Sequence, residues 1–222
     1  MATTPQPTER RADALSKARI VEAAIALLDA GGESALTFRA LAGRLATGSG
    51  AIYHHVADKN DLLAAASDSI IARIVGEAGA TPREAIRAIA AGVFDAIDDH
   101  PWVGAQLHRE PWRPAMLQIF EGVGSQLQAL GVPEPAQFDA AAVLVNYILG
   151  VAVQNAANAR MQPPDADRTA LLAAVAARWT QHDPAEYPFV HKVAAQLPEH
   201  DDREQFLAGI DLILVGISGL GR

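Results

Sequence analysis

The chain has 222 residues and a formal net charge of −8 at pH 7, a length that suits a small domain followed by a larger one. Half of its residues are hydrophobic, with alanine prominent, and alanine has the highest helix propensity, so the composition favours an all-α fold. The sequence contains no cysteine, which excludes disulfides, thiol nucleophiles and thiolate metal ligands.

The N-terminal part of the chain differs in charge from the rest. Residues 1–60 carry seven basic and six acidic residues, a net charge of +1, whereas the remainder carries eleven and twenty, a net charge of −9. A charge of +1 is too small to predict DNA binding by itself. The polar residues 1–14 have no signal-peptide core, and we expect them to form a disordered tail.

Four helices are expected in the first third of the chain, over residues 16–30, 37–45, 49–56 and 58–76. Apolar residues recur at helical spacing in the first of them, and Gly31 and Gly32 are expected to end it. Thr37 and Asp58 are good N-caps for the second and fourth helices, because their side-chain oxygens accept hydrogen bonds from free backbone N–H groups.

Beyond residue 80 the apolar periods predict only further helices. We expect them over residues 82–98, 101–109, 112–130, 135–160, 165–181 and 201–219, with a shorter one within 184–198. The longest nearly apolar stretch, residues 138–153, contains Asp139 and Asn146 and is too short to span a bilayer. We therefore predict an all-α cytoplasmic protein without membrane contact, divided into residues 15–62 and 63–222.

The second and third helices are separated by three residues and meet at a small alanine, as in a helix-turn-helix. An ordinary corner between two helices is the alternative on spacing alone. The outward-facing residues of the third helix are Ser49, Gly50, Ala51, Tyr53 and His54. Small residues let a backbone approach the major groove, and polar side chains beside them reach bases and phosphates, which favours the helix-turn-helix.

The block LTFRALAGRLATGSGAIYHHVADKNDLL, residues 36–63, resembles the helix-turn-helix signature of the TetR family of transcriptional regulators. The matching residues are Thr37, Phe38, Leu41, Ala42, Ile52, Tyr53, His55, Val56, Lys59, Leu62 and Leu63. The turn departs from the family pattern, since this chain has Ala46-Thr47-Gly48 where glycine followed by an apolar residue is usual. Residues 100–103, 138–153, 187–190 and 206–214 resemble the C-terminal domain of the tetracycline-repressor branch.

The resemblance implies a homodimer that binds a palindromic double-stranded operator, usually as a repressor, and that a small-molecule effector releases. Tyr53 and Lys59 would contact phosphates and His54 a base edge, while His55 is structural. The full set of DNA-contacting residues implied is Thr37, Arg44, Thr47, Gly48, Ser49, Gly50, Ala51, Tyr53, His54 and Lys59.

Two helices of the C-terminal domain are expected to form the dimer interface. The final helix has almost no polar face between Ile210 and Leu220, which favours burial on both sides. The interface residues expected are Val143, Tyr147, Gly150, Val151, Ile210, Ile213, Leu214 and Ile217. The alternative for each of them is the core of its own chain.

Polar or aromatic residues inside apolar helices are the candidate effector contacts, because ligand pockets are apolar with a few placed polar groups. They are Trp102, His108, Trp112, Met116, Phe120, Asn146, Tyr147, Gln154 and Trp179. Each can instead belong to the core or the interface. Asn146 is the most informative, since an amide in an apolar segment needs a hydrogen-bonding partner.

The sequence argues against an enzyme. Its seven histidines show no zinc-ligand spacing, and there is neither a nucleophile elbow nor a phosphate-binding glycine loop. We therefore expect no metal site and no cofactor. The alternatives to a repressor are a transcriptional activator and a non-catalytic helical ligand-binding protein.

Overall fold

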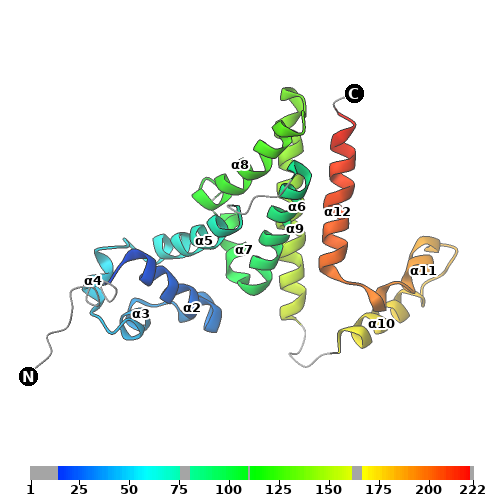
Figure 1. Cartoon of the computed structure of the whole chain (residues 1–222). Coiled ribbons are helices and arrows are strands. Elements are labelled where there is room, and N and C mark those ends of the chain that lie inside the picture. Colours follow the sequence, from blue (N-terminus) through cyan, green and yellow to red (C-terminus); the bar gives the residue numbers. More distant parts are fainter. Residues whose placement is uncertain (1–14, 76–80, 110, 162–166, 221–222) are drawn as a thin grey trace, which may run out of the picture.

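The computed structural model describes residues 15–75, 81–109, 111–161 and 167–220. Within these ranges the chain forms eleven α-helices, one short 3-10 helix and no strand, which confirms the all-α prediction (Figure 1). The predicted tail, residues 1–14, lies outside the described residues.

The N-terminal helices are α2 (Lys17–Ala35), α3 (Phe38–Arg44), α4 (Ser49–Tyr53) and α5 (Lys59–Val75). Both predicted caps are present: Thr37 Oγ1 accepts from Ala40 N at 3.1 Å, and Asp58 Oδ1 accepts from Asp61 N at 2.8 Å. The regular geometry of the first helix ends at the glycine pair, as predicted: Gly31 and Gly32 both have non-helical backbone angles, and Gly32 has a φ of +65°. A short helical segment follows this break, so that α2 as a whole extends to Ala35.

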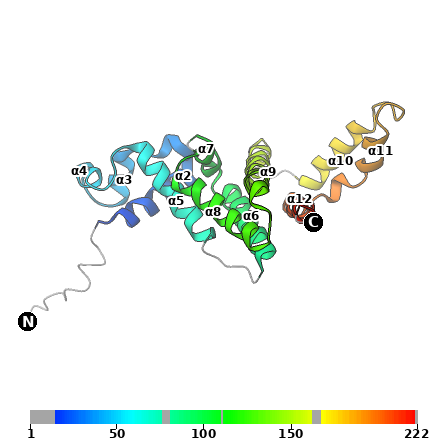
Figure 2. The same ribbon diagram turned by 90° about the horizontal axis from the view of Figure 1, so that it is seen from above.

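The C-terminal part begins with α6 (Pro82–Asp99), α7 (Pro101–Arg109), α8 (Pro114–Ala129) and α9 (Glu134–Arg160). It continues with α10 (Arg168–Trp179), α11 (Pro188–Ala194), the 3-10 helix η1 (Leu197–Glu199) and α12 (Asp202–Ser218). Helices α6, α8, α9 and α12 pack on one another, whereas α10 and α11 project away from this bundle (Figure 2).

Helix α9 is the central element of the C-terminal bundle and packs against α6, α7, α8 and α12. Of the described helices, it alone is long and apolar enough to cross a membrane by length and composition. Its buried residues include Leu144, Ile148 and Ala152, spaced by four, so one side of α9 is core. The apolar run that we judged too short in the sequence therefore belongs to a longer helix of the bundle.

Two sets of contacts join the N-terminal helices to the bundle. Helix α5 runs from α4 into the bundle, where it packs on α6, α7 and α8. In the second set, Asp29 Oδ1 of α2 accepts from Trp102 Nε1 at 2.8 Å and lies 2.7 Å from His100 Nδ1. Glu33 Oε1, one turn further along α2, accepts from Gln106 and Arg109 of α7, both at 3.0 Å. The two parts are therefore joined both by the packing of α5 and by these hydrogen bonds between α2 and the bundle.

Candidate functional site

The turn between α3 and α4 is the place where the sequence, Ala46-Thr47-Gly48, departs from the family pattern, and its backbone geometry shows how alanine fits there. Ala46 has a φ of +51°, in the left-handed region that favours glycine. Its N–H donates to Gly43 O at 3.3 Å, and the N–H of Thr47 donates to Ala42 O at 3.0 Å. These two bonds form a Schellman motif, so alanine occupies the position where helices usually place glycine.

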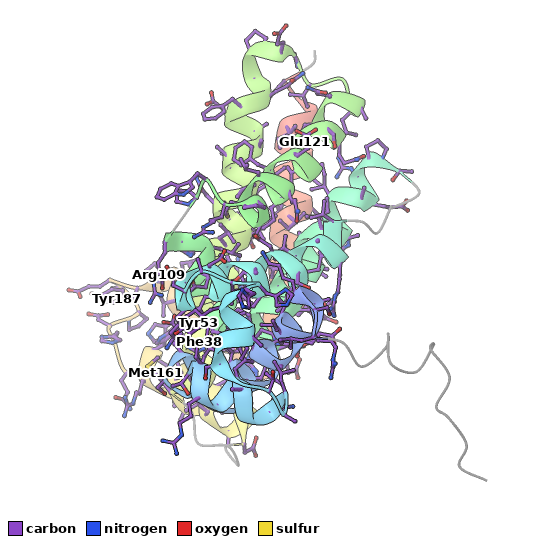
Figure 3. The ribbon with its side chains drawn as sticks, turned by 90° about the vertical axis from the view of Figure 1, so that its left-hand side faces the viewer. Phe38, Tyr53, Arg109, Glu121, Met161 and Tyr187 are labelled. Carbon is purple, nitrogen blue, oxygen red and sulfur yellow. The ribbon has the colours of Figure 1, made fainter. Side chains whose placement is uncertain are left out.

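Helix α4 presents a small and open surface. A Cβ added to Gly48 or Gly50 would meet no atom within 4 Å, so packing within the chain does not require glycine at either position. Tyr53 stacks on Phe38 with ring centroids 4.3 Å apart and an interplanar angle of 11°, and the two labelled rings lie side by side in Figure 3. Tyr53 remains half exposed and His54 is exposed, so both can meet another molecule.

The other predicted DNA contacts differ in their exposure and in their hydrogen bonds within the chain. Thr37 and Arg44 are exposed at the two ends of α3, and Ser49, Ala51 and Thr47 are partly buried around α4. Lys59 is not free in this structure, because its Nζ donates to the backbone carbonyl of Glu33. That bond joins α5 to α2. It uses one of the three donors of the ammonium group, and the phosphate contact of Lys59 stays a prediction.

A cavity of about 1010 Å³ opens between α5, α6, α8 and α9. Val75 lies at the α5 end, Ile89 on α6 and Phe138 on α9, while most of α8 from Pro114 to Gln128 forms the remaining wall. This volume is at the upper end of the range for small-molecule sites. Glu121, on its wall, lies well apart from the α4 surface in Figure 3.

Close helix packing shapes the back of this cavity. A Cβ at Gly122 would lie 2.9 Å from Val75 Cγ1 and 3.1 Å from Ile89 Cδ1, so glycine lets α8 approach α5 and α6. At Gly124, two residues further along α8, a Cβ would meet no atom within 4 Å. The first glycine is required by packing, whereas the second leaves room.

The nine predicted effector contacts all lie in the described part of the chain, and only Phe120 lines this cavity. Trp102 is buried at the junction with α2, where it donates to Asp29, and Met116 faces α5 and α7. His108 lies at a separate cavity of about 300 Å³ between α7 and α9. Trp112 is exposed before α8, and Trp179 lies in the projecting α10.

Three further predicted contacts are on other faces of α9. Asn146 and Gln154 are exposed, so the amide that we expected inside a pocket faces out of the chain. Tyr147 packs on α12: its ring lies 5.6 Å from that of Phe206, and its hydroxyl donates to Phe206 O at 3.3 Å. Burial raises the pKa of Tyr147 above its ordinary value. A Cβ at Gly209 would overlap the Tyr147 hydroxyl, which explains the glycine there.

Sequence reasoning missed the main lining helix. Along α8, Ala115, Ile119, Val123 and Leu127 repeat every four residues and are buried, while the opposite side carries glutamines and glycines. The signal was therefore present as a helix with one apolar stripe and an unusual Gly/Gln face. A criterion of polar residues within apolar runs does not select such a face.

The predicted dimer residues divide between core and surface. Ile210, Leu214 and Ile217 are buried within their own chain, and Tyr147, Val151 and Ile213 are partly buried. Val143 and Gly150 are exposed on α9. The exposed large apolar side chains of α12 are Leu212 and Val215, at 74% and 64% exposure, and neither belongs to the predicted set.

Asp68 of α5 links the cavity wall to the helix that begins beside α4. Its Oδ1 accepts from Ala115 N at 2.9 Å, and α8 has no N-cap side chain of its own because Arg113 makes no capping bond. Burial raises the pKa of Asp68, and the Ala115 N–H and the charge of Arg113 partly oppose that shift. The first turn of α8 is thus held by α5.

Comparisons with known proteins agree with this architecture. Residues 20–66 match the family profile of bacterial regulatory proteins of the tetR family, and residues 76–220 match that of the tetracyclin repressor-like C-terminal domain. The chain therefore belongs to the TetR family of helix-turn-helix transcriptional regulators. The profile bounds divide the chain near the end of α5, which itself crosses the boundary predicted at residue 62.

Individual relatives fit the same assignment. An HTH-type transcriptional regulator of Saccharopolyspora erythraea is 34% identical over 149 residues, 66% of this chain and 63% of that protein. The chain spans less than two thirds of the curated regulators that it matches. The structure of the transcriptional regulator SCO7222, a TetR from Streptomyces coelicolor, matches with a TM-score of 0.87 and 51% identity, over 94% of this chain and 100% of that one.

A more distant structure shares the fold alone. The TetR family protein ActR of Streptomyces coelicolor, in complex with actinorhodin, matches with a TM-score of 0.74 and 22% identity, over 94% of this chain and 100% of that one.

Proposed function

We propose that this chain is a repressor that binds a palindromic operator as a homodimer and leaves it when a small molecule fills the cavity beside α8. One observation carries the proposal: α5 begins next to the α4 surface at Lys59 and ends at the cavity wall at Val75. A ligand that shifts the far end of α5 therefore changes the position of α4.

Operator binding is assigned to α4 and the turn before it. Gly48 and Gly50 leave the backbone open to close approach, while Tyr53 and His54 offer a phosphate contact and a base contact. A helix of this length reads few base pairs, so a dimer with two half-sites is needed for specificity.

The second subunit is assigned to the outer faces of α9 and α12. These helices pack against each other, and both carry aliphatic side chains with more than half of their surface exposed, Val143 on α9 and Leu212 and Val215 on α12. Exposed apolar clusters of this kind mark interaction surfaces. Two copies joined there would bury four helices together.

Release would follow from a difference in effector affinity between the DNA-binding state and a state with wrongly spaced α4 helices. The Asp68–Ala115 hydrogen bond ties α8 to α5, so a displaced α8 acts on the helix that leads to α4. Glu33 separately ties α2 to α7 of the bundle. The protein would act in the cytoplasm and perform no catalysis, and no cofactor takes part in this scheme.

The test is a pair of titrations on the full chain. Fluorescence anisotropy with a palindromic operator and a scrambled duplex, at several salt concentrations, should show a preference for the operator that persists as salt weakens both. Calorimetry of the effector with and without operator should give affinities that differ by about 5–150-fold, since linkage is reciprocal. Equal affinities would remove release by that ligand from the proposal. A reporter gene placed behind the operator distinguishes repression from activation, because repression lowers its expression when the chain is supplied.

A further inference from the structure

The cavity beside α8 contains little charge. Among its described lining residues, Glu121 is the one charged side chain, and it is exposed at the rim. No described lysine, arginine or histidine lines the cavity. An anionic ligand would lose its hydration there, meet no compensating charge, and be repelled by Glu121.

Gln118, on the cavity wall, carries an acceptor without a donor. Its Oε1 is closed off from solvent and has no hydrogen-bond partner among the described residues, so a ligand in the cavity meets this oxygen when the Gln118 side chain turns toward the opening. Other side-chain donors on the cavity wall, further along α8 and at the start of α9, are engaged within the chain: Gln137 Nε2 donates to Val132 O at 2.9 Å, Gln128 Nε2 to Gln137 Oε1 at 3.3 Å, and Ser125 Oγ to Gly122 O at 3.2 Å. A buried acceptor left unpaired is costly, so a bound molecule gains by bringing a donor to Gln118.

Two aromatic rings frame the same wall. Phe120 of α8 and Phe138 of α9 lie with ring centroids 6.1 Å apart and tilted by 38°. Phe138 is 71% exposed, so most of its ring lacks a partner within the chain. Pairs of aromatic rings are stabilised in offset and tilted arrangements. The flat ring of a ligand that enters here can therefore pack against Phe120 and Phe138.

On the proposed function that this cavity takes the effector, we propose that the effector is an aromatic molecule without negative charge, whose hydroxyl or amine group donates a hydrogen bond to Gln118 Oε1. Its ring system packs against Phe120 and Phe138. A positively charged amine is compatible with the same site, because Glu121 faces the opening.

Four naphthalene probes separate these features by calorimetry on the full chain. They are 2-naphthol, a neutral donor; 2-naphthylmethylammonium, a cationic donor; 2-methoxynaphthalene, which has no donor; and 2-naphthoate, an anion. We expect both donors to bind, the methoxy compound to bind about tenfold more weakly than naphthol, and naphthoate to show no binding. Equal affinity for naphthol and its methyl ether, tightest binding of naphthoate, or no binding of any probe at millimolar concentration each overturns the proposal.

Variants locate the donor site. Gln118→Leu should remove the preference for naphthol over its methyl ether, whereas Gln126→Leu, on the same helix and lining the same cavity, should keep it. Gly124→Leu should weaken all binding at least tenfold without unfolding the chain, since a Cβ there meets no atom and leucine favours helix over glycine. Loss of the preference in the Gln126 variant alone, or unchanged binding in the Gly124 variant, overturns the proposal.

Operator anisotropy on the same preparations separates the two levels of inference. A chain that binds its operator but does not rank the probes as expected overturns the ligand class and leaves the repressor standing. A chain that ranks the probes as expected but prefers no duplex supports the cavity chemistry and overturns the repressor.

Discussion

Ala46 is the residue at which the helix-turn-helix departs from the usual glycine. A left-handed backbone costs an L-residue about 1–2 kcal/mol, while glycine loses about 0.4–1 kcal/mol more through the entropy of its unfolded chain. Ala46→Gly should therefore raise the free energy of unfolding by about 0.5–1 kcal/mol, measured by urea denaturation. Ala40→Gly, within α3, is the control and should lower it by about 1 kcal/mol. A destabilised Ala46 variant would contradict the Schellman geometry.

Tyr53 and His54 are adjacent but face different partners. Tyr53→Phe keeps the ring stacked on Phe38 and removes only the hydroxyl, so it should weaken binding to all duplexes to a similar extent. His54→Ala should cost about 1–3 kcal/mol of operator affinity and relax the preference at one base pair. Fluorescence anisotropy with operator and singly mutated duplexes measures both.

Phe38→Leu is the control for the stack, because it removes one ring and leaves both DNA-facing side chains in place. Its effect should appear in thermal stability more than in sequence preference. If neither Tyr53→Phe nor His54→Ala changes operator affinity, α4 is not the helix that reads DNA.

At the scale of elements, the sequence predicted most helices to within a few residues. Thr37, Asp58 and Thr81 cap the helices that follow them, and prolines begin α6, α7, α8 and α11, so local chemistry sets these ends. Cavities and interfaces follow different rules. They depend on which side of a helix its neighbours cover. The apolar stripe of α12 is compatible with the core of the chain and with a subunit interface, and the packing of α12 on α6 and α9 shows which side is core.

The link between α5 and α8 makes stability depend on pH at Asp68. Its pKa is raised on folding, so its contribution is fully present below the ordinary value of 3.8 and is lost as pH rises through the raised pKa. Asp68→Asn keeps an oxygen that can accept from Ala115 N and cannot ionise. The variant should gain stability relative to the parent as pH rises from about 4, and the difference should level off above the raised pKa.

Urea denaturation at a series of pH values measures this difference. Asp139→Asn, on an exposed face of α9, serves as the control for removing one carboxylate. A difference that shrinks with rising pH would mean that the folded state favours the ionised Asp68, against the effect of burial.

At the scale of the whole molecule, the α4 surface could be predicted because its residues lie within one short block of sequence. The cavity could not, because its lining comes from four helices between Val75 and Ala141 and depends on the close approach permitted by Gly122. The proposed interface lies between these cases: the sequence points to α9 and α12, which stays a prediction, and the packed structure shows that Ile210 and Leu214 are buried within the chain.

Leu212 tests the interface because it is exposed in the single chain and its replacement creates no buried charge within the subunit. Leu212→Arg would bring an unpaired charge into a dry contact between two copies, and the twofold symmetry would place two such charges there. We expect a folded chain of half the parent's mass in light scattering and a loss of operator affinity of at least tenfold, although α4 is unchanged. Leu130→Arg, exposed at the end of α8, is the control and should remain dimeric and bind the operator normally. A Leu212 variant that stays dimeric with full operator affinity would place the subunit contact elsewhere on the bundle.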